Sequence, residues 1–369
     1  MPKISICVPC YNVEKYIGRC LDSLVSQTLK DIEIICVDDC STDHTWNILC
    51  EYRAKYPEIK IYRHLENLQS VWARKTALSF ASGDYILFVD GDDCLKTNAC
   101  RILLEKAAAT DADIVEFCCD QVDCDGRVVH SEKEYCSVHD GCLNSVEIFS
   151  AVSENRIGQM LWNKLYRASL IRAVYLRSGI RELYYKDDVY IACLVYREAK
   201  KYVGIPDKLY CYRMNSGNSR QTTMTLHTFQ DRCKCAKVCI DWLYCFYVAG
   251  QLQEAECKLI KSKINIWCKR NTLNDFLNSA TAETAPEFLD VYLNAWFSDE
   301  CIQLCGSKEE RVRNVCLYQV RILLDALRTI GETFGAAIIR GCKRFGKLKE
   351  LFIREQKYDI AQTLEDAEF

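Results

Sequence analysis

The sequence predicts an α/β protein with a mostly parallel sheet flanked by helices, followed by a mainly helical C-terminal region. In the first half of the chain, short apolar runs alternate with segments of helical periodicity, the pattern of a parallel sheet covered by helices. The chain has 369 residues, of which 49% are hydrophobic, enough to bury a large core. After about residue 225 strand-like runs become few, so we predict one domain over residues 1–225 and a helical domain over residues 226–369.

The chain begins with a strand and a helix. The apolar run at residues 4–8 is ended by Pro9, as expected of a buried parallel strand. Asn12 is a candidate N-cap for the helix that follows, and Glu14 lies near the positive end of that helix dipole. The apolar residues of this helix recur at helical spacing: Tyr16, Ile17, Cys20, Leu21, Leu24 and Val25.

The alternation continues along the first half of the chain. Further strands are predicted at residues 32–37, 59–62, 85–89 and 114–117. A helix marked by Trp46, Leu49 and Tyr52 stops before Pro57, and a helix at 71–82 ends at Gly83. Ligands bind such sheets at the carboxyl ends of the strands, so the side chains that follow each strand are the candidates for function.

Composition and charge exclude several classes of protein. The formal net charge is -3, so no basic excess indicates a nucleic-acid partner. No apolar run is long enough to span a bilayer, and no signal-peptide pattern precedes the first strand. We therefore expect a cytoplasmic protein, in which the 25 cysteines act as small buried hydrophobes rather than as disulfides.

Two acidic clusters follow predicted strands directly. Asp38 and Asp39 follow the run at 34–37, and Asp90-Gly91-Asp92-Asp93 follows the run at 86–89. Carboxylates at buried strand ends need partners, and Mg²⁺ or Mn²⁺ prefers hard oxygen ligands of this kind. The alternative is that these acids form turns and cap helices, which would be the better explanation of an isolated D-x-D.

The acids belong to a longer, ordered series of motifs. The series is V-P-C-Y-N at 8–12, V-D-D-C-S-T-D at 37–43, G-D-Y-I at 83–86, D-G-D-D at 90–93 and W-N-K-L-Y-R at 162–167. It resembles the family-two glycosyltransferases, whose catalytic domain has the GT-A fold, and the last motif is similar to that of bacterial members that build surface polysaccharides. The resemblance covers about residues 1–220.

The resemblance implies an activity, a cofactor and partners. It implies inverting transfer of a hexose or N-acetylhexosamine from a nucleotide diphosphate sugar, with UDP as the implied nucleotide, to a hydroxyl of a glycan or lipid-linked glycan. It also implies Mn²⁺ or Mg²⁺, which would neutralise charge on the departing diphosphate. By position, Pro9, Tyr11 and Asp39 would hold the nucleotide base. Asp90 and Asp92 would handle the ribose, the diphosphate and the metal, with Asp92 as the direct ligand. The full set implied at the nucleotide-sugar site is Pro9, Tyr11, Asn12, Asp38, Asp39, Arg74, Asp90, Gly91, Asp92, Arg213 and Arg220.

Inverting transfer needs a base that takes the proton of the acceptor hydroxyl. The family usually supplies it from a Glu-Asp pair, and the matching residues here are Asp187 and Asp188, with Asp188 at the base position. Asp187 replaces the usual Glu. The alternative is a helix N-terminus rich in acids.

Two further stretches match the family less closely. Residues 210–213 and 216–220 resemble its Y-x-R and G-S-x-S/T segments, where Arg213 or Arg220 could clamp phosphate; a surface loop explains them equally well. The third helix keeps Arg74 of the usual A-R-N-x-G. However, Gln69, Lys75 and Ala77 stand where the family has Gly, Asn and Gly. We expect altered donor-side geometry.

Two rival functions follow from the same residues. A sugar nucleotidyltransferase would carry a Gly-rich loop with a basic residue after the first strand, where this chain has Tyr11-Asn12-Val13-Glu14. A degenerate, non-catalytic glycan-binding scaffold is suggested by the departures at Gln69 and Lys75, and opposed by the intact acids.

The C-terminal stretch near 335–357 combines an apolar helical face with many basic residues. Such a segment could lie on an anionic membrane at its cytoplasmic face, where a lipid-linked acceptor would be found. An ordinary helix with a solvated basic face fits the pattern equally well.

Overall fold

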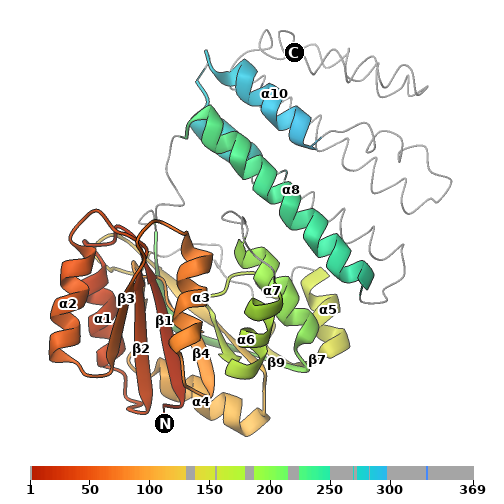
Figure 1. Cartoon of the computed structure of the whole chain (residues 1–369). Coiled ribbons are helices and arrows are strands. Elements are labelled where there is room, and N and C mark those ends of the chain that lie inside the picture. Colours follow the sequence, from red (N-terminus) through yellow and green to blue (C-terminus); the bar gives the residue numbers. More distant parts are fainter. Residues whose placement is uncertain are drawn as a thin grey trace. The chain divides into compact units, whose positions relative to one another are not determined.

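The computed structural model describes residues 2–129, 138–153, 156–178, 187–214, 224–249, 269, 272–281, 283–296 and 330. The chain divides into two compact units, Met1–Arg220 and Gln221–Phe369. The first unit contains the sheet and the motifs (Figure 1). The assignment of a catalytic and a helical domain stays a prediction, and Arg220 and the basic stretch near 335–357 lie outside the described residues.

The described part of the chain forms a nine-stranded sheet in the order β3-β2-β1-β4-β8-β6-β9-β5, with β7 paired to β9. Strands β1, β2, β3, β4, β6 and β9 run in one direction, whereas β5, β7 and β8 run in the opposite one. The strands are β1 (Ile4–Cys10), β2 (Ile32–Asp38), β3 (Ile59–Arg63), β4 (Tyr85–Phe88), β5 (Cys94–Leu95), β6 (Ile114–Val122), β7 (Gly141–Asn144), β8 (Lys164–Arg167) and β9 (Lys201–Arg213). The predicted fold class is confirmed. β1, β2, β3 and β4 form within two residues of their expected bounds, whereas β6 continues to Val122, five residues beyond the predicted end at 117.

Helices lie on both faces of this sheet (Figure 1). The helices of the first unit are α1 (Ile17–Val25), α2 (Thr45–Lys55), α3 (Ser70–Phe80), α4 (Ala99–Thr110), α5 (Ser145–Ser153), α6 (Ala168–Arg177) and α7 (Asp187–Glu198). On one face Val8 and Leu87 join a buried cluster with Leu21 of α1 and Leu103 of α4. Because side chains alternate along a strand, Phe88 points to the other face, where its ring centroid lies 6.2 Å from that of Tyr175 in α6.

The parallel strands β1, β2 and β4 place their carboxyl ends along one edge. Pro9 lies opposite Val37, and Cys10 lies opposite Asp38, in the β1–β2 register. On the other side of β1, Cys7 lies opposite Phe88. The segments that follow these strands therefore start at the same edge of the sheet, with the acidic motifs after β2 and β4 on either side of the end of β1.

Glu33 links the opposite, amino-terminal part of β2 to its neighbours. Its Oε1 accepts hydrogen bonds from Ser5 Oγ and from the Ser82 backbone N–H, both 2.6 Å away, and its Oε2 lies 2.6 Å from Lys60 Nζ. Gly83 completes this junction by donating its N–H to Ser5 Oγ. A Cβ on Gly83 would lie 2.7 Å from Ser5 N, which explains the glycine of the G-D-Y-I motif.

Substitution Glu33→Gln should destabilise the first unit. Burial alone raises the pKa of Glu33, but the hydrogen bonds from Lys60, Ser5 and Ser82 outweigh it and lower the pKa to about 2. The unfolded-state pKa is about 4.3, so the stabilisation is present above that pH and is lost as the pH falls toward the folded-state value. We expect a loss on the order of 2 kcal/mol at pH 7. Chemical denaturation should show the gap to wild type shrinking below about pH 4; a gap independent of pH would contradict this account.

The described part of the second unit is helical. It contains α8 (Leu226–Ala249) and α10 (Ala285–Trp296). Phe229 packs its ring against Phe276 and Phe288, with centroids 6.3 and 5.0 Å away. None of the described helices combines the length and the apolar character needed to cross a membrane.

Candidate active site

The D-G-D-D motif forms a tight turn after β4. The Asp93 N–H donates to the Asp90 carbonyl oxygen over 3.0 Å. Gly91 lies close to β1, because an added Cβ would be 3.3 Å from the Pro9 carbonyl oxygen. Gly91, between Asp90 and Asp92, therefore lies against the end of β1. The roles of the two acids in binding stay predictions.

Asp93 is the buried member of this cluster. It accepts hydrogen bonds from the Arg213 N–H (2.7 Å) and from Tyr210 Oη (2.9 Å). Burial, and then the charges of Asp92 and Asp90, raise the pKa of Asp93 well above its usual range. Asp93 therefore favours its protonated form more than an exposed aspartate does.

Arg213 binds the backbone of the D-G-D-D turn. Its Nε donates to the Asp92 carbonyl oxygen (3.0 Å), and its Nη1 donates to the carbonyl oxygens of Asp123 (2.7 Å) and Cys124 (2.8 Å). The residue is only 3% exposed. The structure thus gives Arg213 a backbone-holding role that the sequence did not indicate, and its contact with a phosphate stays a prediction.

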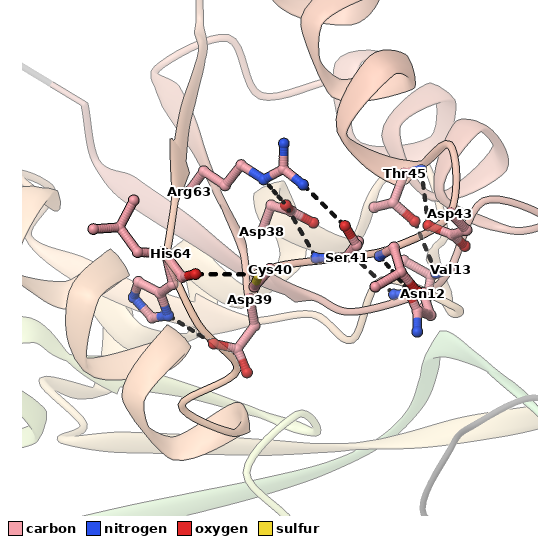
Figure 2. A network of polar contacts seen from close by, with 12 residues as sticks. Asn12, Val13, Asp38, Asp39, Cys40, Ser41, Asp43, Thr45, Arg63 and His64 are labelled. Carbon is pink, nitrogen blue, oxygen red and sulfur yellow. Dashed lines mark hydrogen bonds and ion pairs between the residues drawn. The ribbon is translucent and has the colours of Figure 1, made fainter.

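The loops after β1 and β2 are locked together, as Figure 2 shows. The Asn12 N–H donates to Ser41 Oγ (3.0 Å), and the Asn12 side chain accepts from the Thr42 N–H (2.8 Å). The expectation that Asn12 caps the first helix is wrong, because α1 begins at Ile17 with Tyr16 at its N-cap. Asn12 has a φ of 50°, which turns its side chain toward the neighbouring loop instead.

Asp38 and Asp39 have different surroundings at the end of β2 (Figure 2). Asp38 is fully buried and pairs with Arg63 Nε over 2.9 Å. Asp39 Oδ1 lies 2.7 Å from His64 Nδ1 and accepts from the Leu68 N–H, and its Oδ2 accepts from the Gln69 N–H. A carboxylate has about four acceptor sites, so these contacts orient Asp39 and leave it capacity for a further donor.

His64 is a residue that the sequence analysis missed. Its Nε2 lies 2.9 Å from Thr76 Oγ1, while its Nδ1 contacts Asp39. The signal was available, because His64 directly follows β3, at the same sheet edge as the acids. Its ring joins the end of β2 to α3.

Gln69 occupies the position where the motif usually has glycine, and the structure shows the consequence. Its φ is 74° and its ψ is 165°, a region adopted almost only by glycine. Hydrogen bonds from the N–H groups of Leu68 and Gln69 to Asp39 hold the backbone there. Gln69, one of the residues that differ from the family pattern, is therefore a strained residue that contacts Asp39.

Substitution Gln69→Gly should stabilise the fold. Strain of this kind costs about 1–3 kcal/mol, and glycine costs about 0.5–1 kcal/mol of unfolded-state entropy, so we expect a net gain of about 1 kcal/mol. The matched control is Gln121→Gly in β6, where φ is ordinary and glycine should destabilise by about 1 kcal/mol. Denaturation midpoints measure both; equal destabilisation by the two variants would disprove the strain at Gln69.

Asp187 and Asp188, the two acids predicted to supply the general base, lie at the start of α7. Asp187 is buried, and burial raises its pKa to about 6, with Arg74 opposing the shift and Asp188 adding to it. Asp188 is less buried, and its Oδ1 accepts from the Val189 N–H over 2.8 Å. Arg74 contacts both Asp187 (3.3 Å) and Asp90 (3.1 Å). The structure thus brings together three motifs that are far apart in the sequence.

The comparisons with known proteins agree with this geometry. The family model described as Glycosyl transferase family 2 matches residues 5–187. Glycosyltransferase GlyG of Streptococcus pneumoniae is 30% identical over 238 residues, which are 62% of this chain and 76% of GlyG. The chain belongs to glycosyltransferase family 2.

Other relatives share shorter parts of their length with this chain. Glycosyltransferase GlyA of Streptococcus pneumoniae is 33% identical over 221 residues, which are 58% of this chain and 31% of GlyA. Glycosyltransferase EpsJ of Bacillus subtilis is 32% identical over 215 residues, which are 58% of this chain and 62% of EpsJ. The chain therefore spans less than two thirds of either relative.

A solved structure confirms the predicted GT-A type of fold. The crystal structure of S. aureus TarS 1–349 in complex with UDP-GlcNAc superposes with a TM-score of 0.63 at 22% sequence identity. The match covers 90% of this chain and 91% of TarS 1–349. The fold agrees with the membership of this chain in the family.

Proposed function

We propose that this enzyme is an inverting glycosyltransferase that uses a UDP-sugar. It moves a hexose or N-acetylhexosamine to a hydroxyl of a glycan or lipid-linked glycan during assembly of a bacterial surface polysaccharide. The observation that carries the proposal is the pair of contacts that Arg74 makes with Asp90, after β4, and with Asp187, next to Asp188 at the start of α7. Asp39 lies beside the start of α3, the helix of Arg74, where it accepts the Gln69 N–H. The UDP-GlcNAc in TarS supports the choice of nucleotide.

The acids after β4 fit a divalent cation. Asp90 and Asp92 lie two positions apart in one turn, and their carboxylate oxygens are hard ligands. Among the residues that the structure describes, no three His, Cys, Asp or Glu side chains are grouped to hold a metal. Mg²⁺ usually binds one or two protein carboxylates together with substrate phosphates, so Asp92, with Asp90, would hold Mn²⁺ or Mg²⁺ in that way. The cation would supply electrostatic stabilisation of the departing diphosphate.

The two acids of α7 divide the work of proton transfer. Asp188, the less buried of the two, accepts the proton of the acceptor hydroxyl while that oxygen bonds to the anomeric carbon. The bond from the anomeric carbon to the diphosphate oxygen breaks on the opposite side, so an α-linked donor gives a β-linkage. Asp187, buried and paired with Arg74, orients its neighbour.

A panel of UDP- and GDP-sugars with Mn²⁺ tests this function. We expect release of UDP together with sugar transfer, and no consumption of nucleoside triphosphate, as a nucleotidyltransferase would require. Preference for a GDP-sugar would overturn the choice of nucleotide. Binding of glycans without turnover of any donor would instead favour the scaffold.

A further inference from the structure

Arg74 connects the two acidic groups of the site. It lies on α3, and its side chain is 9% exposed. Its Nη2 lies 3.1 Å from Asp90 Oδ1, after β4, and its Nη1 lies 3.3 Å from Asp187 Oδ2, at the start of α7. A single guanidinium therefore contacts both the donor-side acids and the helix that carries Asp188.

The environment of Arg74 favours this bridge over other contacts. Burial by itself lowers the pKa of Arg74, but the charges of Asp90 and Asp187 outweigh that and raise it. The Arg74 Cζ atom lies over the Phe88 ring, 6.0 Å from its centroid. Within the described part of the chain, the buried Nε of Arg74 has no hydrogen-bond partner. The side-chain hydrogen bonds of the guanidinium are made by Nη1 and Nη2, each to a different aspartate.

The shape of this side chain makes the bridge specific. A guanidinium is planar and offers its donors in a fixed fork, so contacts from Nη1 and Nη2 to two carboxylates constrain the separation of those carboxylates. Here the carboxylates belong to a strand end and a helix start that are 97 positions apart, from Asp90 to Asp187. Lysine, with one ammonium on a flexible stem, does not impose the same constraint.

We infer that Arg74 is a positioning residue that fixes the first turn of α7, and with it Asp188, relative to the acids that follow β4. The inference rests on the proposed function, and it differs from the role that the family resemblance implies for Arg74, which is contact with the donor. A misplacement of reacting groups by about 1 Å can cost about 10²-fold in rate. Loss of the bridge should therefore slow the chemical step while leaving donor binding largely intact.

Steady-state kinetics of the full chain separate the two roles. We expect Arg74→Gln to lower kcat about 30-fold and to change the donor KM by less than about 3-fold, and Arg74→Lys to restore part of kcat. Asp187→Asn should lower kcat about 10-fold, and the double variant should resemble Arg74→Gln alone, because both changes break one contact. Arg101→Gln is the matched control, since Arg101 forms an exposed ion pair with Glu105 on α4. A donor KM raised more than about 10-fold with kcat unchanged, and additive effects of the two substitutions, would overturn the inference.

Amide hydrogen exchange tests the same inference without activity. Arg74→Gln should speed exchange in the first two turns of α7 about 10-fold, and Arg101→Gln should not. If Arg74→Gln does not fold, Arg74→Lys and Asp187→Asn are measured in its place. Both weaken the contact between residues 74 and 187, and both keep a positive charge at position 74. Unchanged exchange in α7 would contradict the positioning role even if the enzyme transfers sugar. If the wild type turns over no nucleotide sugar, the proposed function fails, while the exchange result still decides whether Arg74 fixes α7.

Discussion

Substitution Asp188→Asn is expected to lower kcat by about 10² to 10⁴-fold, the usual contribution of a general base, and to leave donor binding nearly unchanged. Asparagine keeps the size of aspartate, and its side-chain oxygen can still accept the hydrogen bond from the Val189 N–H. It cannot take the proton of the acceptor hydroxyl. Single-turnover transfer, beside calorimetric binding of UDP with Mn²⁺, measures the two effects separately.

Asp187→Asn is the matched control for that experiment. It makes the same chemical change one residue away, in a side chain that is paired with Arg74, and its effect on kcat should be smaller. If Asp187 were the base instead, the wild-type rate would rise with pH through a limb near 6, because burial raises the pKa of Asp187 to about 6 and the protonated form cannot accept a proton. Near wild-type transfer by Asp188→Asn, together with loss of that limb in Asp187→Asn, would reverse the assignment.

Substitution Asp92→Asn is expected to weaken metal-dependent UDP binding as well as turnover. Removing one oxygen ligand from a cation held by few protein carboxylates should reduce metal-supported affinity by about 10-fold or more. In the wild type, EDTA should abolish transfer, and Mn²⁺ or Mg²⁺ should restore it. Calorimetry with and without Mn²⁺ measures the binding effect.

The control for Asp92→Asn is Asp125→Asn. Asp125 is exposed and pairs with Arg127 outside the acidic turn, so its substitution should alter neither UDP binding nor metal dependence. Full activity of the wild type after exhaustive chelation would show that the acids after β4 do not act through a metal.

The sequence predicted the parallel part of the fold well, for a physical reason. The buried parallel strand β4 is a continuous apolar run, and so is residues 34–37 of β2. The helices between the strands have a repeat that is visible in one sequence. The antiparallel strands carry no such signal. β5 contains only Cys94 and Leu95, and β8 is a four-residue strand placed by its pairing with β4 and β6. Tertiary contacts, rather than local pattern, define these strands.

In the candidate active site, too, some features could be predicted from the sequence and others could not. The placement of Asp39, Asp90 and Asp92 at one edge of the sheet could be predicted, because each follows a parallel strand at its carboxyl end. Their roles stay predictions. The backbone-holding contacts of Arg213 could not, since they join it to carbonyl oxygens of Asp123 and Cys124 in a distant turn.

The anomeric form of the first product distinguishes a single, inverting displacement of the nucleotide diphosphate from a retaining reaction. With an α-linked UDP-sugar and water as a surrogate acceptor, proton NMR can follow the released sugar before its anomers interconvert. We expect the β-anomer to appear first, and Asp188→Asn to slow its formation together with transfer. Initial release of the α-anomer would show retention of configuration and would rule out the inverting mechanism.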